Sequence, residues 1–279
     1  MSDAKTDPKK IMLYIISDSV GETGFNLAQA ALAQFPQIKP IYCRFPFVNT
    51  DEKLDKILDQ AKADHAIIVH TLATKGLAAK ITNFSEQNGL VSFDYITPLL
   101  TEVSKRTGLT QTYEAGAVHH LNARYFDRIS AMEFAVLYDD GKDPKGFLEA
   151  DVVLLGVSRT SKTPLSLFLA NKNIKVANLP LVPQAHIPDE LWKVDPKKII
   201  GLTNDPSVLN NIRRERMIAY GLNPDTTYSD MDRIKEELKY ANELYKKLGC
   251  LVINVAHRSI EETATIIMES LNLDTYENN

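Results

Sequence analysis

Short, continuous apolar runs recur along this chain and alternate with longer segments of helical periodicity. The first is residues 10–17, KIMLYIIS, and a later one is residues 151–156, DVVLLG. Runs of this length without polar alternation are typical of strands that are buried on both faces, as in parallel sheets. Strands that alternate with helices favour right-handed βαβ units. The sequence therefore predicts an α/β fold with largely parallel sheets.

The alternation occurs twice. Strands are expected at residues 10–17, 38–45, 65–72 and 90–96, and again at residues 151–156, 174–182, 197–203 and 250–256. Between the two series, a helix expected at roughly 119–138 leads into DDGKDPKG, a cluster of Asp, Gly and Pro that is typical of a linker. We therefore predict two tandem α/β units, an N-terminal domain over 1–145 and a C-terminal domain over 146–279.

Composition narrows the class of protein. The formal net charge is −4, so no overall basic field favours a nucleic-acid partner. Cys43 and Cys250 are too few for a disulfide framework, which fits a reducing compartment. No apolar run approaches the length of a membrane span. These features predict a soluble, cytoplasmic protein that binds neither nucleic acid nor membrane.

The most informative loop follows the run at 151–156 and reads GVSRTSKTP. In a phosphate-binding loop, backbone N–H groups and the N-terminus of the next helix point at an anion. Gly156 would supply the tight exit from the strand, Lys162 the compact positive charge, and Thr163 a hydroxyl where Mg²⁺ usually sits. The candidate binding residues are Gly156, Val157, Ser158, Arg159, Thr160, Ser161, Lys162 and Thr163.

One position departs from the usual pattern, because Ser161 stands where a glycine normally precedes the lysine. A serine there must adopt the glycine conformation at some steric cost. Arg159 could hold a second phosphoryl group through the N–H donors of its planar guanidinium group. The alternative is a polar turn between strand and helix that carries a solvated lysine.

Other candidates carry weaker signals. The loop SDSVGETG at 17–24 could bind phosphate, but its two acids disfavour an anion, and a capped turn is an equal alternative. Asp139 and Asp140 read first as a turn and second as a carboxylate pair. The remaining candidates are interpreted first as structural or solvated side chains: His65, His70, the pair His119–His120, His186 and His257. Trp192 is interpreted as a core or interface anchor. Arg213, Arg214 and Arg216 are interpreted as a solvated helix face, and alternatively they could form a phosphate lid.

Several strings together resemble one family. GVSRTSKTPLS, KVANLPLVP, SDSVGETG, HHLNARYFDRISAMEFAVLYDDG and RSIEETA are similar, in order, to the regulatory proteins of pyruvate, phosphate dikinase and of phosphoenolpyruvate synthase. The resemblance implies a bifunctional serine/threonine kinase and phosphorylase. Such a protein phosphorylates an active-site threonine of its target with ADP and removes that phosphate with inorganic phosphate, releasing pyrophosphate.

The resemblance also implies the partners and the site. The protein substrate is expected to be the dikinase, with the synthase as alternative, and a homodimer is left open. The loop at 156–163 would be the nucleotide site of a P-loop kinase-like domain. From the chemistry of phosphoryl transfer we expect Mg²⁺ on Thr163, and Lys162 and Arg159 as catalytic residues, with an arginine of the 213–216 cluster as the alternative to Arg159. Asp151, Asp139 and Asp140 are candidates for the carboxylate that orients the acceptor, and Asp151 is the one nominated as catalytic. Asn122 stands where an acid is expected, so that position is not nominated.

Two rival functions fit the loop. A small-molecule kinase would turn over ATP without a protein partner, since short P-loop domains often act on metabolites. A non-catalytic nucleotide sensor would bind ADP without transfer, which Ser161 motivates. The N-terminal domain is predicted to recognise the protein substrate.

Overall fold

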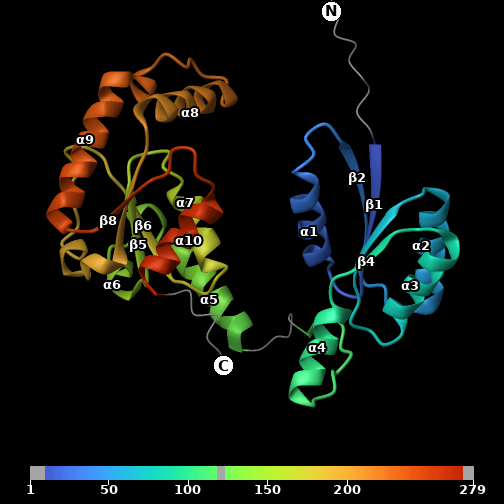
Figure 1. Ribbon diagram of the computed structural model, residues 1–279. Coiled ribbons are helices and arrows are strands. Elements are labelled where there is room, and N and C mark those ends of the chain that lie inside the picture. The colour runs from blue at the N-terminus through green and yellow to red at the C-terminus, as the bar shows by residue number, and fades with distance from the viewer. Residues whose placement is uncertain (1–9, 118–122, 273–279) are drawn as a thin grey trace, which may run out of the picture. The chain divides into compact units, whose positions relative to one another are not determined.

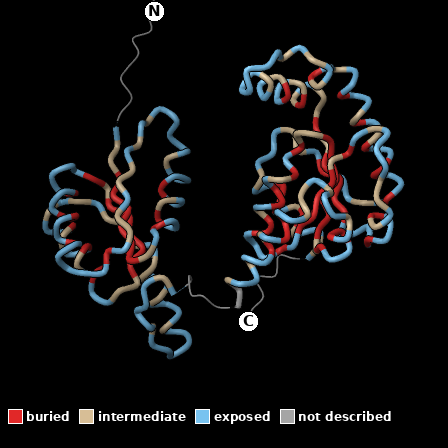
Figure 2. Tube along the Cα trace, turned by 180° about the vertical axis from the view of Figure 1, so that it is seen from behind, coloured by how far each residue is buried: buried red, intermediate tan, exposed pale blue. Residues whose placement is uncertain are grey.

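The computed structural model describes residues 10–117 and 123–272 of the chain. The chain divides into two compact units, Met1–His120 and Leu121–Asn279, and each is an α/β unit with a parallel sheet (Figure 1). The predicted α/β class and the tandem arrangement of parallel sheets are confirmed. Figure 2 shows that the buried residues of each unit concentrate along its strands.

The first unit holds a sheet with the strand order β2-β1-β3-β4, in which every neighbouring pair is parallel. Its strands are β1 (Lys10–Ser17), β2 (Lys39–Phe45), β3 (Ile67–Thr71) and β4 (Ser92–Asp94). Its helices are α1 (Glu22–Leu32), α2 (Asp51–Ala63), α3 (Leu77–Asn88) and α4 (Thr97–Thr107).

Helices cover both faces of this sheet, and that explains the continuous apolar run in β1. Tyr14 and Ile16 pack with residues of α2 and α3, whereas Leu13 and Ile15 pack with Ala28 of α1. Successive side chains of a strand point to opposite faces. Because each face of β1 has its own helical cover, every position in the middle of the strand must be apolar.

The second unit repeats the same topology, with the strand order β6-β5-β7-β8 and parallel pairs throughout. Its strands are β5 (Val152–Gly156), β6 (Val176–Pro180), β7 (Ile199–Thr203) and β8 (Leu251–Asn254). Its helices are α5 (Ala123–Leu137), α6 (Gly146–Glu149), α7 (Lys162–Ala170), α8 (Pro206–Ala219), α9 (Met231–Leu248) and α10 (Ile260–Ser270). Short 3₁₀ turns lie at η2 (Asp139–Gly141), η3 (Leu191–Lys193), η4 (Pro196–Lys198) and η5 (Thr227–Ser229).

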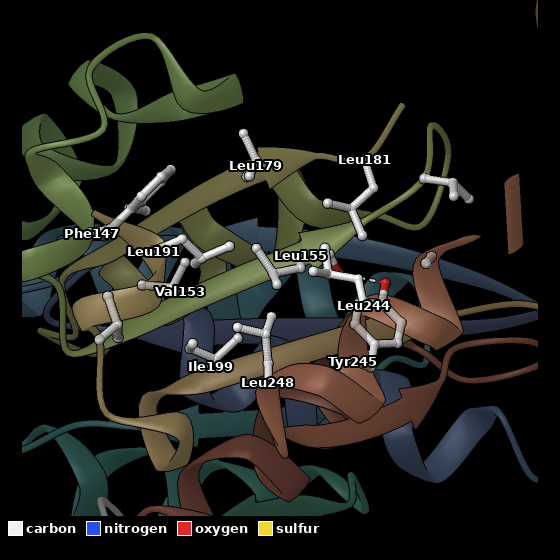
Figure 3. Packing of buried hydrophobic residues seen from close by; sticks show 14 of the residues in the cluster. Phe147, Val153, Leu155, Leu179, Leu181, Leu191, Ile199, Leu244, Tyr245 and Leu248 are labelled. Atoms are coloured by element: carbon white, nitrogen blue, oxygen red, sulfur yellow. Dashed lines mark hydrogen bonds between the residues drawn. The ribbon is translucent and has the colours of Figure 1, made fainter. Parts of the chain in front are cut away.

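The core of the second unit lies on both faces of β5. Val153 and Leu155 pack on the side of α9 (Figure 3), and Val152 and Leu154 pack on the side of α7 and α10. The side chain of Tyr245, in α9, packs directly against the sheet, and its hydroxyl donates to the Leu202 carbonyl at 2.9 Å. These contacts fix the strand whose carboxyl end carries the loop of interest.

The boundary between the units differs from the predicted one, which lay after residue 145. Helix α5 belongs to the second unit, because Ala131 and Ala135 pack on Ala170 of α7 and Phe134 joins the core around β5. The Asp, Gly and Pro cluster is therefore no linker between domains. It is a turn inside the second unit, where the Asp140 N–H donates to the Asn178 side chain of β6 at 3.2 Å.

None of the helices in the described parts of the chain combines the length and apolar character that crossing a membrane requires.

Candidate phosphate-binding site

The loop of residues 157–161 leaves the carboxyl end of β5 at the place where the strand order reverses. β6 lies on one side of β5 and β7 on the other, so β5 is the central strand at the switch point. In open parallel sheets, ligands bind in the crevice outside the carboxyl ends of the strands at this point. The topology therefore puts the predicted loop where a ligand site is expected.

Gly156 is required by the close packing at the start of the loop. A Cβ added at this position would lie 2.4 Å from the Thr160 hydroxyl oxygen and 3.2 Å from the Leu202 carbonyl oxygen. Thr160 is fully buried, and its hydroxyl donates to the Val157 carbonyl at 3.0 Å. The loop thus folds back on its own first residues, and only a glycine leaves room for that turn.

Ser161 adopts the left-handed conformation, with φ 60° and ψ 24°, directly before the first residue of α7. This is the conformation that a glycine would adopt without steric cost, and the expected strain at Ser161 is confirmed. Arg159 is also left-handed, with φ 73°. Two non-glycine residues in this region within one short loop are uncommon, and such strain concentrates at functional sites.

The backbone of the loop presents donors without protein partners. Within the described chain, the N–H groups of residues 158–163 donate to no other residue, and the first helical bond runs from Leu165 N–H to the Ser161 carbonyl. These N–H groups lie at the N-terminus of α7, where the helix dipole also favours negative charge. A phosphate group at this position would find several backbone donors close together.

Lys162 is buried, with 7% of its surface exposed, and its Nζ donates to the Val157 carbonyl at 3.0 Å. Burial lowers the pKa of Lys162 from 10.5 to about 8, while Asp140 and Asp139 act in the opposite direction. The interpretation of the loop as a turn with a solvated lysine is therefore wrong in this respect. A buried cation whose ammonium group already points back at the loop is suited to a bound anion.

Asp139 and Asp140 lie beside this loop, although they precede it by more than an entire strand. The Thr163 hydroxyl donates to Asp139 Oδ1 at 2.9 Å, and the Asn178 side-chain amide donates to the same oxygen at 2.7 Å. Asp140 is exposed, and its carboxylate accepts no hydrogen bond from the described residues. Both interpretations from sequence hold, because the turn η2 brings the carboxylates of Asp139 and Asp140 near Thr163 and Lys162.

Asp151 is not brought to the loop. It precedes the first residue of β5, and its Oδ2 accepts a hydrogen bond from the Lys175 N–H at 2.9 Å. The loop begins at the other end of the strand, about 16 Å away at roughly 3.3 Å per residue. The nomination of Asp151 as a catalytic carboxylate therefore has no geometric support, and its side chain instead ties β5 to the start of β6.

Tyr228, in the turn η5, is a residue of this site that the sequence did not indicate. Arg159 Nε donates to its hydroxyl at 2.9 Å, and the Ser158 hydroxyl lies 3.1 Å from the same oxygen. Tyr228 thus holds the arginine that was predicted to meet a second phosphoryl group. No motif marks this tyrosine, since it lies about 70 positions beyond the loop, and only the fold brings it there.

The predicted arginine cluster separates into different roles. Arg213 is fully buried, donates to the Ser158 carbonyl at 3.2 Å and pairs with Glu237 at 2.6 Å. It is neither a solvated side chain nor a mobile lid but a support of the loop backbone. Arg214 pairs with Asp225 and Arg216 with the Tyr220 hydroxyl, both away from the loop residues.

The remaining candidates stay outside this site. His70 is buried in β3, where burial lowers its pKa, and its Nδ1 lies 4.0 Å from Asp94 Oδ1. Trp192 is half exposed, so it is not a core residue. His119, His120 and Asn122 lie outside the described residues. Among the residues that are described, no group of three or more His, Cys, Asp or Glu side chains could hold a metal ion.

The fold and the site together define a class, a two-unit α/β protein whose second unit carries a strand–loop–helix arrangement suited to a phosphate group. Residues 13–268 match the family described as Kinase/pyrophosphorylase. The chain belongs to this family. The predicted membership in the family of dikinase and synthase regulatory proteins is confirmed, and a kinase or phosphotransferase type of activity is supported.

Curated relatives are similar over nearly their full length. A protein of Latilactobacillus sakei named "Putative pyruvate, phosphate dikinase regulatory protein 1" is 67% identical over 95% of this chain and 94% of its own. Proteins of Lacticaseibacillus casei and Lactiplantibacillus plantarum, which carry that name without the numeral, are each 62% identical. The first covers 97% of this chain and 98% of its own, and the second 96% and 98%.

Among solved structures, an ABC transporter periplasmic solute binding protein from Actinobacillus succinogenes with bound D-allose is 11% identical. The match covers 98% of this chain and 93% of that chain, with a TM-score of 0.24. A score this low carries no argument about function.

Proposed function

We propose that this chain is a bifunctional regulator of pyruvate, phosphate dikinase. In one direction it phosphorylates an active-site threonine of the dikinase with ADP, which inactivates the target. In the other direction it removes that phosphate with inorganic phosphate and releases pyrophosphate. The observation that carries the proposal is the combination of the buried Lys162, the donor-rich loop and the carboxylates of Asp139 and Asp140. The names of the relatives supply the target.

Phosphoryl transfer asks the protein mainly to position the groups and to neutralise charge. The diphosphate of ADP would lie against the N–H groups of residues 158–163, with the Lys162 ammonium beneath it and the Arg159 guanidinium beside it. Lys162 and Arg159 would thus face the charge that develops on the transferred group. Tyr228 would keep the guanidinium in place through the bond to Arg159 Nε.

In the forward step, the threonine hydroxyl oxygen attacks the β-phosphorus of ADP. The bond between that phosphorus and the oxygen that bridges to the α-phosphorus breaks, and AMP leaves with the bridging oxygen. The hydroxyl proton passes to a carboxylate. We assign this role to Asp140, because it is exposed and unbonded, whereas Asp139 already accepts from Thr163 and Asn178.

In the second reaction, an oxygen of inorganic phosphate attacks the phosphorus of the phosphothreonine. The bond between this phosphorus and the threonine oxygen breaks, the oxygen regains its proton from Asp140, and pyrophosphate leaves. The attacking phosphate would occupy the position that the α-phosphate of AMP holds in the forward step. Inorganic phosphate and AMP should therefore compete, and one loop can serve both directions because both are in-line displacements.

The residues present fit a divalent cation. Thr163 Oγ1 and Asp139 Oδ1 lie 2.9 Å apart, and such oxygen donors are the ligands that Mg²⁺ prefers, together with phosphate oxygens. These two residues would hold Mg²⁺, which when bound neutralises charge on the diphosphate. Without a nucleotide, the Thr163 hydroxyl instead donates to Asp139 and keeps both oxygens in position.

We propose that the first unit recognises the protein substrate. The test is a comparison of the full chain with residues 123–279, a fragment that keeps α5 and the carboxylates of η2. A fragment that starts after the sequence-predicted boundary would lack Asp139 and Asp140 and would test something else. We expect the 123–279 fragment to bind ADP but to phosphorylate intact dikinase far more slowly. Full-rate phosphorylation by the fragment would contradict this division.

The central experiment incubates the full chain with purified dikinase and with ADP labelled on either the α- or the β-phosphate. We expect only the β-label to reach the dikinase, on one threonine that mass spectrometry maps. Phosphoenolpyruvate synthase, tested in parallel, should remain unlabelled. A Lys162→Met variant, which keeps the side-chain length but not the charge, should transfer no label.

Other outcomes would identify other functions. Binding of ADP without transfer to either protein would support a nucleotide sensor, and turnover of ATP without any protein substrate would support a small-molecule kinase. For the second reaction, phosphorylated dikinase is incubated with phosphate while AMP is titrated. Release of free phosphate in place of pyrophosphate, or inhibition by AMP that is not competitive with phosphate, would refute the shared position.

A further inference from the structure

A cavity of about 460 Å³ lies in the first unit, at the carboxyl ends of β1 and β3. It is lined by the loop after β1, by Thr71 at the end of β3 and Ala73 just after it, by Ile96 and Leu100 of the α4 region, and by residues of the segment 111–117. The strand order places β1 at the switch point of this sheet, because β2 and β3 lie on its two sides. Cavities of this size and position commonly hold small ligands.

Two side chains in the wall of this cavity each have an oxygen that accepts no hydrogen bond from the described residues. Asp18 is 6% exposed, and its Oδ2 accepts from the Ala73 N–H, the Thr74 N–H and the Thr74 hydroxyl, each at 2.7 Å. Its other oxygen, Oδ1, accepts from none of the described residues. The Gln111 side-chain oxygen is buried without any hydrogen-bond partner. A ligand that fits this wall must bring N–H or O–H donors, since an unpaired buried acceptor such as the Gln111 oxygen is costly.

The charges around the cavity select the sign of the ligand. The acidic residues Asp18 and Glu22 line the cavity, and no Lys, Arg or His is among the described residues that line it. Glu22 is the first residue of α1, so a carboxylate already stands at the helix end that would otherwise attract an anion. Two basic side chains outside this lining approach it: Arg44, whose guanidinium donates to the Val20 carbonyl at 3.2 Å, and Lys75, whose ammonium lies 5.8 Å from the ring centroid of Tyr113. A phosphate is disfavoured here, and a cation is favoured.

The rest of the wall suits an aliphatic chain that ends in that cation. Val20, Ile96 and Leu100 contribute apolar surface, along which the methylenes of a cationic chain can pack. Tyr113 has a positive φ of 59°, which is rare for a bulky residue. The cavity thus combines an apolar wall with acceptors and carboxylates.

We propose that this cavity binds an organic cation, a primary ammonium or guanidinium group on an aliphatic chain. The methylenes lie along Val20, Ile96 and Leu100, and the N–H donors reach Asp18 Oδ1 and Gln111 Oε1. The cation comes either from a free amine or from a lysine or arginine side chain of a protein. All of the residues that line this cavity belong to the first unit, whereas the residues assigned to phosphoryl transfer belong to the second.

The test uses the full chain and follows backbone N–H signals by NMR. The probe is N-acetyl-lysine methylamide, and the matched neutral compound is N-acetyl-norleucine methylamide, which has the same backbone and lacks the amine. We expect the lysine compound to shift the signals of Ser19, Gly21 and Gly116 in a saturable way, and the norleucine compound to leave them unchanged. Equal binding of both compounds, binding of inorganic phosphate at these signals, or no shift with the lysine compound would overturn the proposal.

Variants then locate the site. Glu22→Gln should weaken binding of the lysine compound about 2- to 5-fold, as expected for an exposed charge pair. Gln111→Leu should weaken it about tenfold, since it removes a buried acceptor for a charged donor. Glu52→Gln is the matched control, with the same change in the first turn of α2, and should have no effect. Equal effects of Glu22→Gln and Glu52→Gln would show that general charge, and not this cavity, attracts the probe.

The source of the cation is decided by comparing butylamine with the pentapeptide Gly-Gly-Lys-Gly-Gly under the same conditions. Tighter binding of the peptide identifies a protein side chain as the occupant, and tighter binding of butylamine identifies a free amine. Binding of neither would overturn the proposal. None of these readouts depends on ADP, phosphate or the dikinase, so they stand or fall separately from the proposed function.

Discussion

The burial of Lys162 predicts an unusual dependence of stability on pH. Burial lowers the pKa of this lysine to about 8 in the folded protein, whereas in the unfolded chain it returns to about 10.4. Between these values the unfolded chain binds a proton that the folded protein does not. The free energy of unfolding must therefore rise as the pH increases from about 8 to about 10.5. Below about pH 8 Lys162 is protonated in both the folded and the unfolded state, and the destabilisation by the buried charge is fully present.

The magnitude follows from the difference between the two pKa values. A separation of roughly 2.5 pKa units corresponds to about 3.4 kcal/mol, of which about 2.5 kcal/mol is realised by pH 10. The variant Lys162→Met keeps the length of the side chain and has no proton to lose. Relative to this variant, the wild-type protein should gain about 2.5 kcal/mol of unfolding free energy between pH 7 and pH 10.

The assay is urea unfolding of both proteins across this pH range. Trp192 is the single tryptophan and lies in the second unit, so its fluorescence reports on the unit that contains Lys162. Subtracting the unfolding free energy of the variant from that of the wild-type protein at each pH removes the contribution of titratable groups that both proteins share. Lys239→Met, on the exposed face of α9, is the control and should show a flat difference. A flat or declining difference for Lys162→Met would refute the argument that the fold buries a lysine cation.

Three further predictions concern the loop. Ser161→Gly should raise the free energy of unfolding by about 1 kcal/mol and keep ADP binding, because it relieves the left-handed strain, whereas Ser161→Ala should not; loss of transfer in both variants would instead give the hydroxyl a chemical role. Gly156→Ala should cost about 1–3 kcal/mol in urea unfolding and weaken ADP binding in calorimetry, since its Cβ would lie 2.4 Å from the Thr160 hydroxyl; unchanged binding would contradict the packing argument. Tyr228→Phe should lower the rate of transfer about tenfold with little change in Tm, because it frees Arg159. Tyr220→Phe, which removes only the contact with Arg216, is its control, and equal rates for the two variants would mean that Arg159 needs no support.

The fold could be predicted from the sequence wherever the signal is local. The apolar run at 10–17 coincides with β1. In α2 the buried residues Leu54, Ile57, Leu58 and Ala61 recur at helical spacing, and Thr50 caps the helix by accepting from the Lys53 N–H. Helix α4 was not predicted. None of its residues is buried, so it has no apolar stripe to reveal its period, and only Pro98 near its start and Gly108 after its end mark it.

The candidate site was predictable only in part, for the same reason. The loop is a single continuous string, and its conformation follows from neighbouring residues. The carboxylates could be proposed but not ranked, because Asp139 reaches Thr163 through the packing of α5 and the turn η2 on β6. Tyr228 and Arg213 contact the loop across long stretches of sequence, and no spacing rule relates them to it.

The burial of Lys162 and the boundary between the units also depend on contacts between residues that are distant in the sequence. A lysine in a polar string reads as solvated, and Asp-Gly-Pro clusters read as linkers, until the packing around them is known. In both cases the deciding contact comes from a distant residue. Val157 and the carboxylates surround the lysine, and Asn178 holds the turn.

Each unit is built from an uninterrupted stretch of chain, and the strand at the centre of each sheet is made first. During synthesis β1 therefore leaves the ribosome before β2 and β3, which pair with its two edges, and before the helices that cover its faces. Until β3 has been added, the run KIMLYIIS exposes apolar side chains and unpaired backbone groups, the combination that favours aggregation. β5 is exposed in the same way when it emerges from the ribosome. The nascent chain thus passes twice through a state in which its most buried strand is its most vulnerable segment, and chaperone protection should be needed most at these two points.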